Sequence, residues 1–137
     1  MRHRVLCGTF LLLSACAQRY AAPARLQTSA APQEAFECVK RQMASLGYKQ
    51  TSIDVDEHRI AGTKYDTEAR RADVQFRRLV HRIEVDVAPD ASGQTEIGVQ
   101  GHTYAEYTTQ RGPTEVEEKA SNQVKEATQK LLDACRG

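Results

Sequence analysis

Two cysteines, Cys38 and Cys135, constrain how this chain can fold. They lie near the two ends of the region with regular apolar periodicity, and no cysteine or histidine stands near either one at metal-ligand spacing. In an oxidising compartment such a pair forms one disulfide. That bond would hold the start of the folded region beside its end, so the fold depends on the compartment in which the chain matures.

Residues 1–15 have the three regions of a secretory signal peptide. Arg2, His3 and Arg4 form a basic head, residues 5–13 are mainly apolar, and small residues follow. The apolar run is about half the length of roughly 20 residues that a membrane-spanning helix needs. We therefore expect this segment to direct export and then to be removed.

Leu13, Ser14, Ala15 and Cys16 end this segment. They resemble the lipobox of bacterial lipoproteins, in which an aliphatic residue and two small residues precede a cysteine. The resemblance implies that Cys16 receives a diacylglycerol and becomes the first residue of the mature chain. Lipid would then anchor the protein to a membrane, stably so if two or three acyl chains are attached.

Ala15 and Ala17 leave a second processing route open. They form the A-x-A site of ordinary signal peptidase, which would cut after Ala17 and discard Cys16. In the lipoprotein interpretation, Ala17 is not the aspartate that resembles an inner-membrane retention signal. This favours the outer membrane, facing the periplasm, in a host with two membranes.

The charge of the chain argues against nucleic acid as a partner. The net charge is +1, and removal of Arg2 and Arg4 leaves the mature chain one charge below neutral, whereas nucleic-acid-binding domains carry a basic excess. The sequence holds no recognised catalytic, zinc or phosphate-loop motif. We therefore expect neither an enzyme nor a cofactor or metal site.

Residues 16–32 are predicted to be a lipid-anchored flexible linker, because they are rich in alanine, include Pro23 and Pro32, and lack a steady apolar period. Residues 33–137 are predicted to form one small α+β domain, since they suffice for one core and not for two.

Apolar spacing predicts a helix after Pro32 that ends at Gly47, and a second helix that opens with a capping box of Thr114 and Glu117 and runs to Cys135. In the third of the intervening strands the apolar parity switches near residues 77–78, which predicts a bulge. The predicted strands cover residues 48–55, 59–65, 74–87 and 95–103.

The predicted fold is α+β: a helix, a four-stranded antiparallel meander and a helix, with both helices on one face of the sheet. Alternating strand directions make the two helices antiparallel, which places Cys38 beside Cys135. The topology therefore supports the disulfide independently of the compartment.

Histidines and carboxylates of the strands are the candidates for chemistry. Pairing Val85 with Ile97 or Val99, so that the apolar sets face the core, puts His81 and His102 on opposite faces, which argues against a metal site. Acidic residues alternate with apolar ones along two strands and suit acid–base work or a cation, but the solvated face of a half-covered sheet is favoured. They are Asp54, Asp56, Glu84 and Asp86.

A group of basic residues between positions 59 and 82 is a candidate surface for an anionic envelope component or an acidic partner, or else a solvated edge. The tyrosines of residues 103–109 are a second candidate contact region. The basic group consists of Arg59, Lys64, Arg70, Arg71, Arg77, Arg78 and Arg82.

Two functional hypotheses remain. In the first, the protein is a lipid-anchored, non-catalytic envelope module that binds a protein partner or an envelope component through the basic group or the uncovered sheet face. In the alternative, it carries a small apolar ligand in a pocket between the sheet and the helices. That pocket would be lined by Phe36, Met43, Ile83, Val99 and Leu131.

Overall fold

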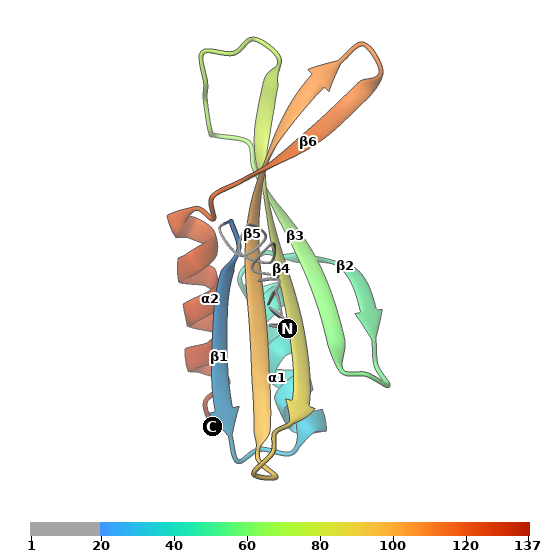
Figure 1. Ribbon diagram of the computed structural model, residues 1–137, viewed down its shortest axis with the longest axis vertical. Helices are drawn as coiled ribbons and strands as arrows, with labels where there is room; N and C mark the ends of the chain where they lie inside the picture. The colour runs from blue at the N-terminus through green and yellow to red at the C-terminus, as the bar shows by residue number, and fades with distance from the viewer. Residues whose placement is uncertain (1–19) are drawn as a thin grey trace, which may run out of the picture.

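The computed structural model describes residues 20–137, so the predicted signal peptide and Cys16 lie outside the described residues (Figure 1). The described part holds an antiparallel sheet of six strands and two helices. In chain order these are β1 (Ala22–Thr28), α1 (Pro32–Ser45), β2 (Lys49–Asp54), β3 (Arg59–Asp66), β4 (Phe76–Pro89), β5 (Thr95–Thr109), β6 (Gly112–Glu118) and α2 (Asn122–Ala134).

The long strand β5 organises the sheet. Strands β2, β3, β4 and β5 are neighbours in that order, and two shorter strands share the other edge of β5. β1 pairs with β5 from Thr95 to Gly101, and β6 pairs with it from Thr103 to Thr109. The β5–β6 hairpin therefore extends past the end of β1, as Figure 1 shows at the top of the view.

The prediction of a four-stranded meander is wrong, because two strands of the sheet were not predicted. One of them lies in the predicted flexible linker. Residues 22–28 form β1, whose alternate residues Ala22, Ala24 and Leu26 pack against the core. Pro23 and Arg25, which lie between these residues, face outward. The alternation was not recognised in the sequence because it is formed largely by alanine and proline. The folded domain thus includes residues 22–28, which the prediction had placed in the linker.

The second missing strand lies where the sequence predicted the opening of the last helix. Residues 112–118 form β6, and Thr114 and Glu117 pair with Tyr107 and Tyr104 of β5. Helix α2 begins only at Asn122, after Ser121, whose side chain accepts a hydrogen bond from the backbone N–H of Val124. The observed N-cap, Ser121, thus lies seven residues after the predicted one, Thr114. Both are polar residues of the kind that helix caps prefer.

Other local predictions are confirmed. Helix α1 ends as expected before Gly47, which adopts a φ of +84° that favours glycine. The register of β4 shifts between Phe76 and Arg78, where the bulge was predicted. Val85 pairs with Val99, one of the two predicted registers.

The core lies between the sheet and the helices. Figure 1 shows α1 behind the sheet and α2 beside β1, and the helices contact each other as well as the strands. Both are amphipathic, so their apolar stripes lose contact with water against β4 and β5. The largest fully buried side chains include Phe36, Met43, Ile83, Ile97 and Leu131. The opposite face of the sheet has no helix over it in the part of the chain described here.

The predicted disulfide is present. Cys38 in α1 is bonded to Cys135 at the end of α2, with 5.8 Å between their Cα atoms. The bond closes a loop that includes most of the domain, and it links α1 to the C-terminal end of α2. No helix within residues 20–137 has the length and apolar character to cross a membrane.

Candidate functional site

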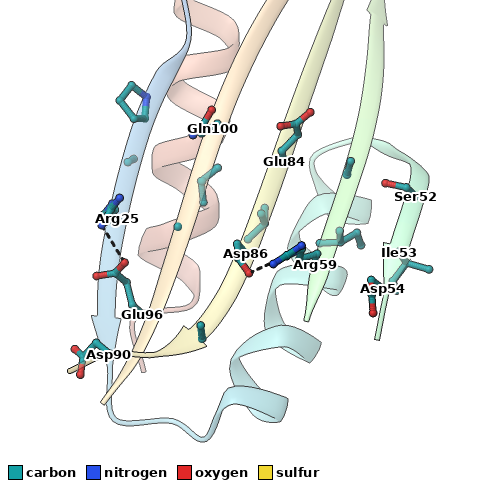
Figure 2. A pocket seen from close by; sticks show the side chains of 18 of the residues that line it. Arg25, Ser52, Ile53, Asp54, Arg59, Glu84, Asp86, Asp90, Glu96 and Gln100 are labelled. Carbon is teal, nitrogen blue, oxygen red and sulfur yellow. Dashed lines mark hydrogen bonds and ion pairs between the residues drawn. The ribbon is translucent and has the colours of Figure 1, made fainter. Parts of the chain in front are cut away.

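A hollow of about 590 Å³ lies on the uncovered face of the sheet (Figure 2). Its lining comes from β1 to β5, and three rows of paired residues cross it. The central row runs from Arg25 through Gly98, Asp86 and Arg59 to Asp54. Because side chains of a strand alternate between faces, every member of this row points to the same side.

The hollow is deep because small residues form its floor. Gly98 carries no side chain at its centre, and Ala61 lies in the adjoining row between Ser52 and Glu84. A Cβ atom on Gly98 would meet only the backbone oxygen of Asp86, at 3.8 Å. The depth of the hollow therefore comes from missing side-chain volume along strands whose backbones are otherwise regular.

Two cross-strand ion pairs lie in the hollow, and Figure 2 draws both. Arg25 is 3.2 Å from Glu96, and Arg59 is 3.6 Å from Asp86. Both arginines are mostly exposed, so each pair contributes at most about 1 kcal/mol to stability. Such pairs orient their side chains but yield readily to a competing charge.

Carboxylates outnumber guanidinium groups in the hollow. Arg25 and Arg59 are its only basic lining residues, so the surface carries net negative charge. The turn after β4 adds the carboxylate of Asp90, whose pKa is lowered chiefly by a hydrogen bond from the hydroxyl of Ser92. The acidic lining residues are Asp54, Glu84, Asp86, Asp90 and Glu96.

The sequence analysis placed Asp54, Asp56, Glu84 and Asp86 on a solvated face. The structure brings three of them together in the hollow, whereas Asp56 lies in the turn between β2 and β3. The sequence analysis missed Arg25 and Glu96, because β1 was not recognised. The pairing of Arg25 with Gly98 follows from the register of β1, for which the sequence offers little signal.

The basic group predicted between positions 59 and 82 does not form one continuous surface. Arg59 lies at the hollow, Lys64 donates to the backbone oxygen of Leu46, and Arg70 donates to backbone oxygens of its own loop. The remaining members are held by carboxylates of β5 and β6. Arg71 pairs with Glu118, Arg77 and Arg78 with Glu106, and Arg82 with Glu115.

Aromatic rings also contact the guanidinium groups of this basic group. Arg78 lies 3.7 Å from the ring centre of Tyr65, and Arg82 lies 4.7 Å from that of Tyr104. The hydrogen bond from Arg71 lowers the pKa of the Glu118 carboxyl group. The positive charge of this region is thus largely satisfied within the protein.

His81 and His102 lie on opposite faces, as the register predicted. His81 is buried on the helix side, where its Nδ1 is 3.1 Å from Ser121 Oγ and burial lowers its pKa. His102 is on the uncovered face, with its Nδ1 2.8 Å from Glu117. Among residues 20–137, no three histidine, cysteine or acidic side chains gather as a metal site would require.

The five residues predicted to line an apolar pocket instead pack together in the core. Each of them is at most 2% exposed. This packing gives no support to the carrier hypothesis, which needs space between the sheet and the helices.

No family model and no curated protein matches the chain. Among solved structures, the chain is similar to a DUF4468 family protein from Bacteroides ovatus ATCC 8483. The two share 11% sequence identity, and the match covers 83% of this chain and 78% of that one, with a TM-score of 0.39. A likeness this distant carries no argument about function.

Proposed function

We propose that the protein is a lipid-anchored, non-catalytic envelope protein that binds a basic segment of a protein partner in the hollow of its uncovered sheet face. The observation that carries the proposal is the hollow itself, which crosses five strands and is acidic on balance. A partner segment with lysine or arginine would have the complementary charge.

The individual carboxylates support this choice of partner. Glu84 is 55% exposed and its nearest basic group is His102, at 3.9 Å. Asp54 makes no ion pair among the described residues, and its Oδ1 accepts the backbone N–H of Glu57. Both are therefore available to an incoming ammonium or guanidinium group, which would lose little solvation in an open hollow.

The membrane anchor rests on the lipobox resemblance at Cys16 and on the disulfide, which is typical of exported domains. Ala17 favours the outer membrane, facing the periplasm, in a host with two membranes. The fold adds a constraint on the tether, because the backbone oxygen of Tyr20 already accepts a hydrogen bond from Ala120. Tyr20 is the fourth residue after Cys16, and four residues of extended chain span at most about 14 Å. An anchored domain would therefore lie close to the bilayer.

The binding proposal is tested with two designed peptides, one alternating lysine with alanine and one alternating glutamate with alanine. They are titrated into the ¹⁵N-labelled mature chain with Cys16→Ala, followed by NMR. We expect the basic peptide to shift amides of β1 and β3–β5 around the hollow, with an affinity that falls as salt rises.

Variants define the site of that binding. Asp54→Asn and Glu84→Gln should each weaken it several-fold, whereas Asp133→Asn on the exposed side of α2 should leave it unchanged. Equal binding of the acidic peptide, or shifts confined to other surfaces, would refute the proposal.

A further inference from the structure

Two segments form a projecting end of the molecule, which extends beyond both helices. They are the loop of residues 67–75, between β3 and β4, and the β5–β6 hairpin of residues 103–118. Figure 1 shows both at the top of the view. The segments are joined, because Thr108 donates its backbone N–H to the oxygen of Gln75 and Arg71 pairs with Glu118. The partner binding proposed above uses the sheet below this end.

Exposed apolar side chains lie at the projecting end. Val74 of the loop is 97% exposed, and Val116 of β6 is 52% exposed. Val116 and Glu118 are two residues apart on one strand, so both point to the face on which Arg71 of the loop meets Glu118. Tyr20, where the described chain begins, is 47% exposed as well. Tyrosine is a residue that membrane–water interfaces favour.

The charges of the projecting end are mostly paired within the protein, so they do not explain its exposed apolar side chains. Arg71 pairs with Glu118, Arg77 and Arg78 pair with Glu106, and Arg82 pairs with Glu115. A less polar environment than water would suit the valines that remain exposed.

The tether limits how far the projecting end can be from the membrane. The backbone oxygen of Tyr20 accepts the N–H of Ala120, and the next residue, Ser121, donates its N–H to Thr103 Oγ1. Tyr20 therefore lies level with Thr103 of β5. From Thr103 to the end of β5 at Thr109 the strand rises about 20 Å. The chain from Cys16 to Tyr20 reaches at most about 14 Å.

These lengths favour one orientation on the bilayer. If Cys16 lies at the surface, a domain standing on its projecting end places the hairpin tip about 6 Å deep, which is the thickness of the headgroup layer. The opposite end lies eight residues of β1 from Tyr20, about 26 Å, and would reach about 12 Å deep, among the acyl chains. Its polar turn at residues 90–94 would lose its hydration there. A shorter tether or a tilt brings the sides of the hairpin down as well.

We propose that the projecting end rests in the headgroup layer of the bilayer that holds the anchor, with the hairpin tip, Val74 and Val116 in contact with lipid. This contact rests on the lipid anchor of the proposed function. It leaves the hollow clear of the membrane, where a partner can reach it.

Tryptophan fluorescence tests the contact, because the natural chain contains no tryptophan. Gln110→Trp at the hairpin tip and Val116→Trp report on the projecting end. Val55→Trp, in the turn between β2 and β3, is the control, since Val55 is 54% exposed and Val116 is 52% exposed. Each acylated full-length protein is reconstituted into phosphatidylcholine vesicles, with and without lipids brominated near the headgroup, which quench tryptophan on contact.

We expect quenching and a blue-shifted emission for Gln110→Trp and Val116→Trp, and neither for Val55→Trp. Added salt should not reverse the effect, because the contact is apolar, whereas it should weaken peptide binding in the hollow.

Mass spectrometry and flotation with the vesicles separate the two possible failures. A chain without acyl groups would overturn the anchor and this contact together. An acylated chain that floats with the vesicles but emits as in water from positions 110 and 116, or is quenched equally at position 55, would overturn this contact alone.

Discussion

Arg78 and Glu106 face each other across β4 and β5, with Arg78 Nη2 3.1 Å from Glu106 Oε2 and the glutamate almost completely buried. Arg77, the extra residue at the bulge, approaches the other carboxylate oxygen at 3.8 Å. The bulge thus brings two consecutive arginines to one buried acid, which ties the extended end of β4 to β5.

Glu106→Gln should destabilise the domain by about 1–3 kcal/mol, because Arg77 and Arg78 lose the buried charged acceptor that they share. Urea denaturation measures the change. Glu115→Gln is the matched control, since its pair with Arg82 is more exposed and its loss should cost less than about 1 kcal/mol. Equal effects of the two variants would show that burial of Glu106 does not matter.

The disulfide should supply a large part of the stability of this domain. Its reduction, or replacement by Cys38→Ser with Cys135→Ser, is expected to cost about 2–5 kcal/mol because the bond restricts the unfolded chain over a long loop. Thermal unfolding with and without reductant measures the effect. An unchanged midpoint in the double variant would contradict this account of the bond.

Strand β1 should be an integral part of the domain. Leu26 packs against the core from β1, so Leu26→Asp should destabilise the fold by about 2 kcal/mol or more. Gln27→Asp, at the neighbouring exposed position, is the control. Amide hydrogen exchange gives a second measure, since β1 amides bonded to β5 should be protected; rapid exchange throughout residues 22–28 would favour the flexible linker after all.

His81 should make stability depend on pH. Burial lowers its pKa in the folded state, so below about pH 6.5 the unfolded chain binds a proton that the folded chain does not. The stabilising contribution is present above that pH and is lost as the pH falls towards the folded-state value. Urea midpoints measured between pH 5 and 8 should show this fall, and His81→Gln should reduce it.

Much of the fold could be predicted where apolar residues alternate against one core. The parity of Ile83, Val85 and Val87 predicts the register of β4 with β5, and that register correctly separates His81 from His102. The pairing of Cys38 with Cys135 could be predicted, because the expected oxidising compartment and the predicted helix directions both indicated this bond.

The two missing strands carry weaker patterns for physical reasons. β1 is built from alanine, proline and arginine, whose alternation has little apolar contrast. Glu115 and Glu118 of β6 face guanidinium groups of β4 and of the loop before it. Their spacing in the sequence therefore resembles that of an exposed helix. Since the hollow requires β1, its full outline could not be predicted from the sequence either.

In vivo photo-crosslinking tests the central claim most directly. A photoreactive amino acid at Gln100, which lines the hollow, is compared with one at Lys125 on the exposed side of α2. The account predicts a discrete protein adduct in the membrane fraction from position 100 alone, lost when Asp54→Asn and Glu84→Gln are added, with a crosslinked segment rich in lysine or arginine. Adducts from position 125 instead, or adducts at position 100 that survive these changes, would contradict it.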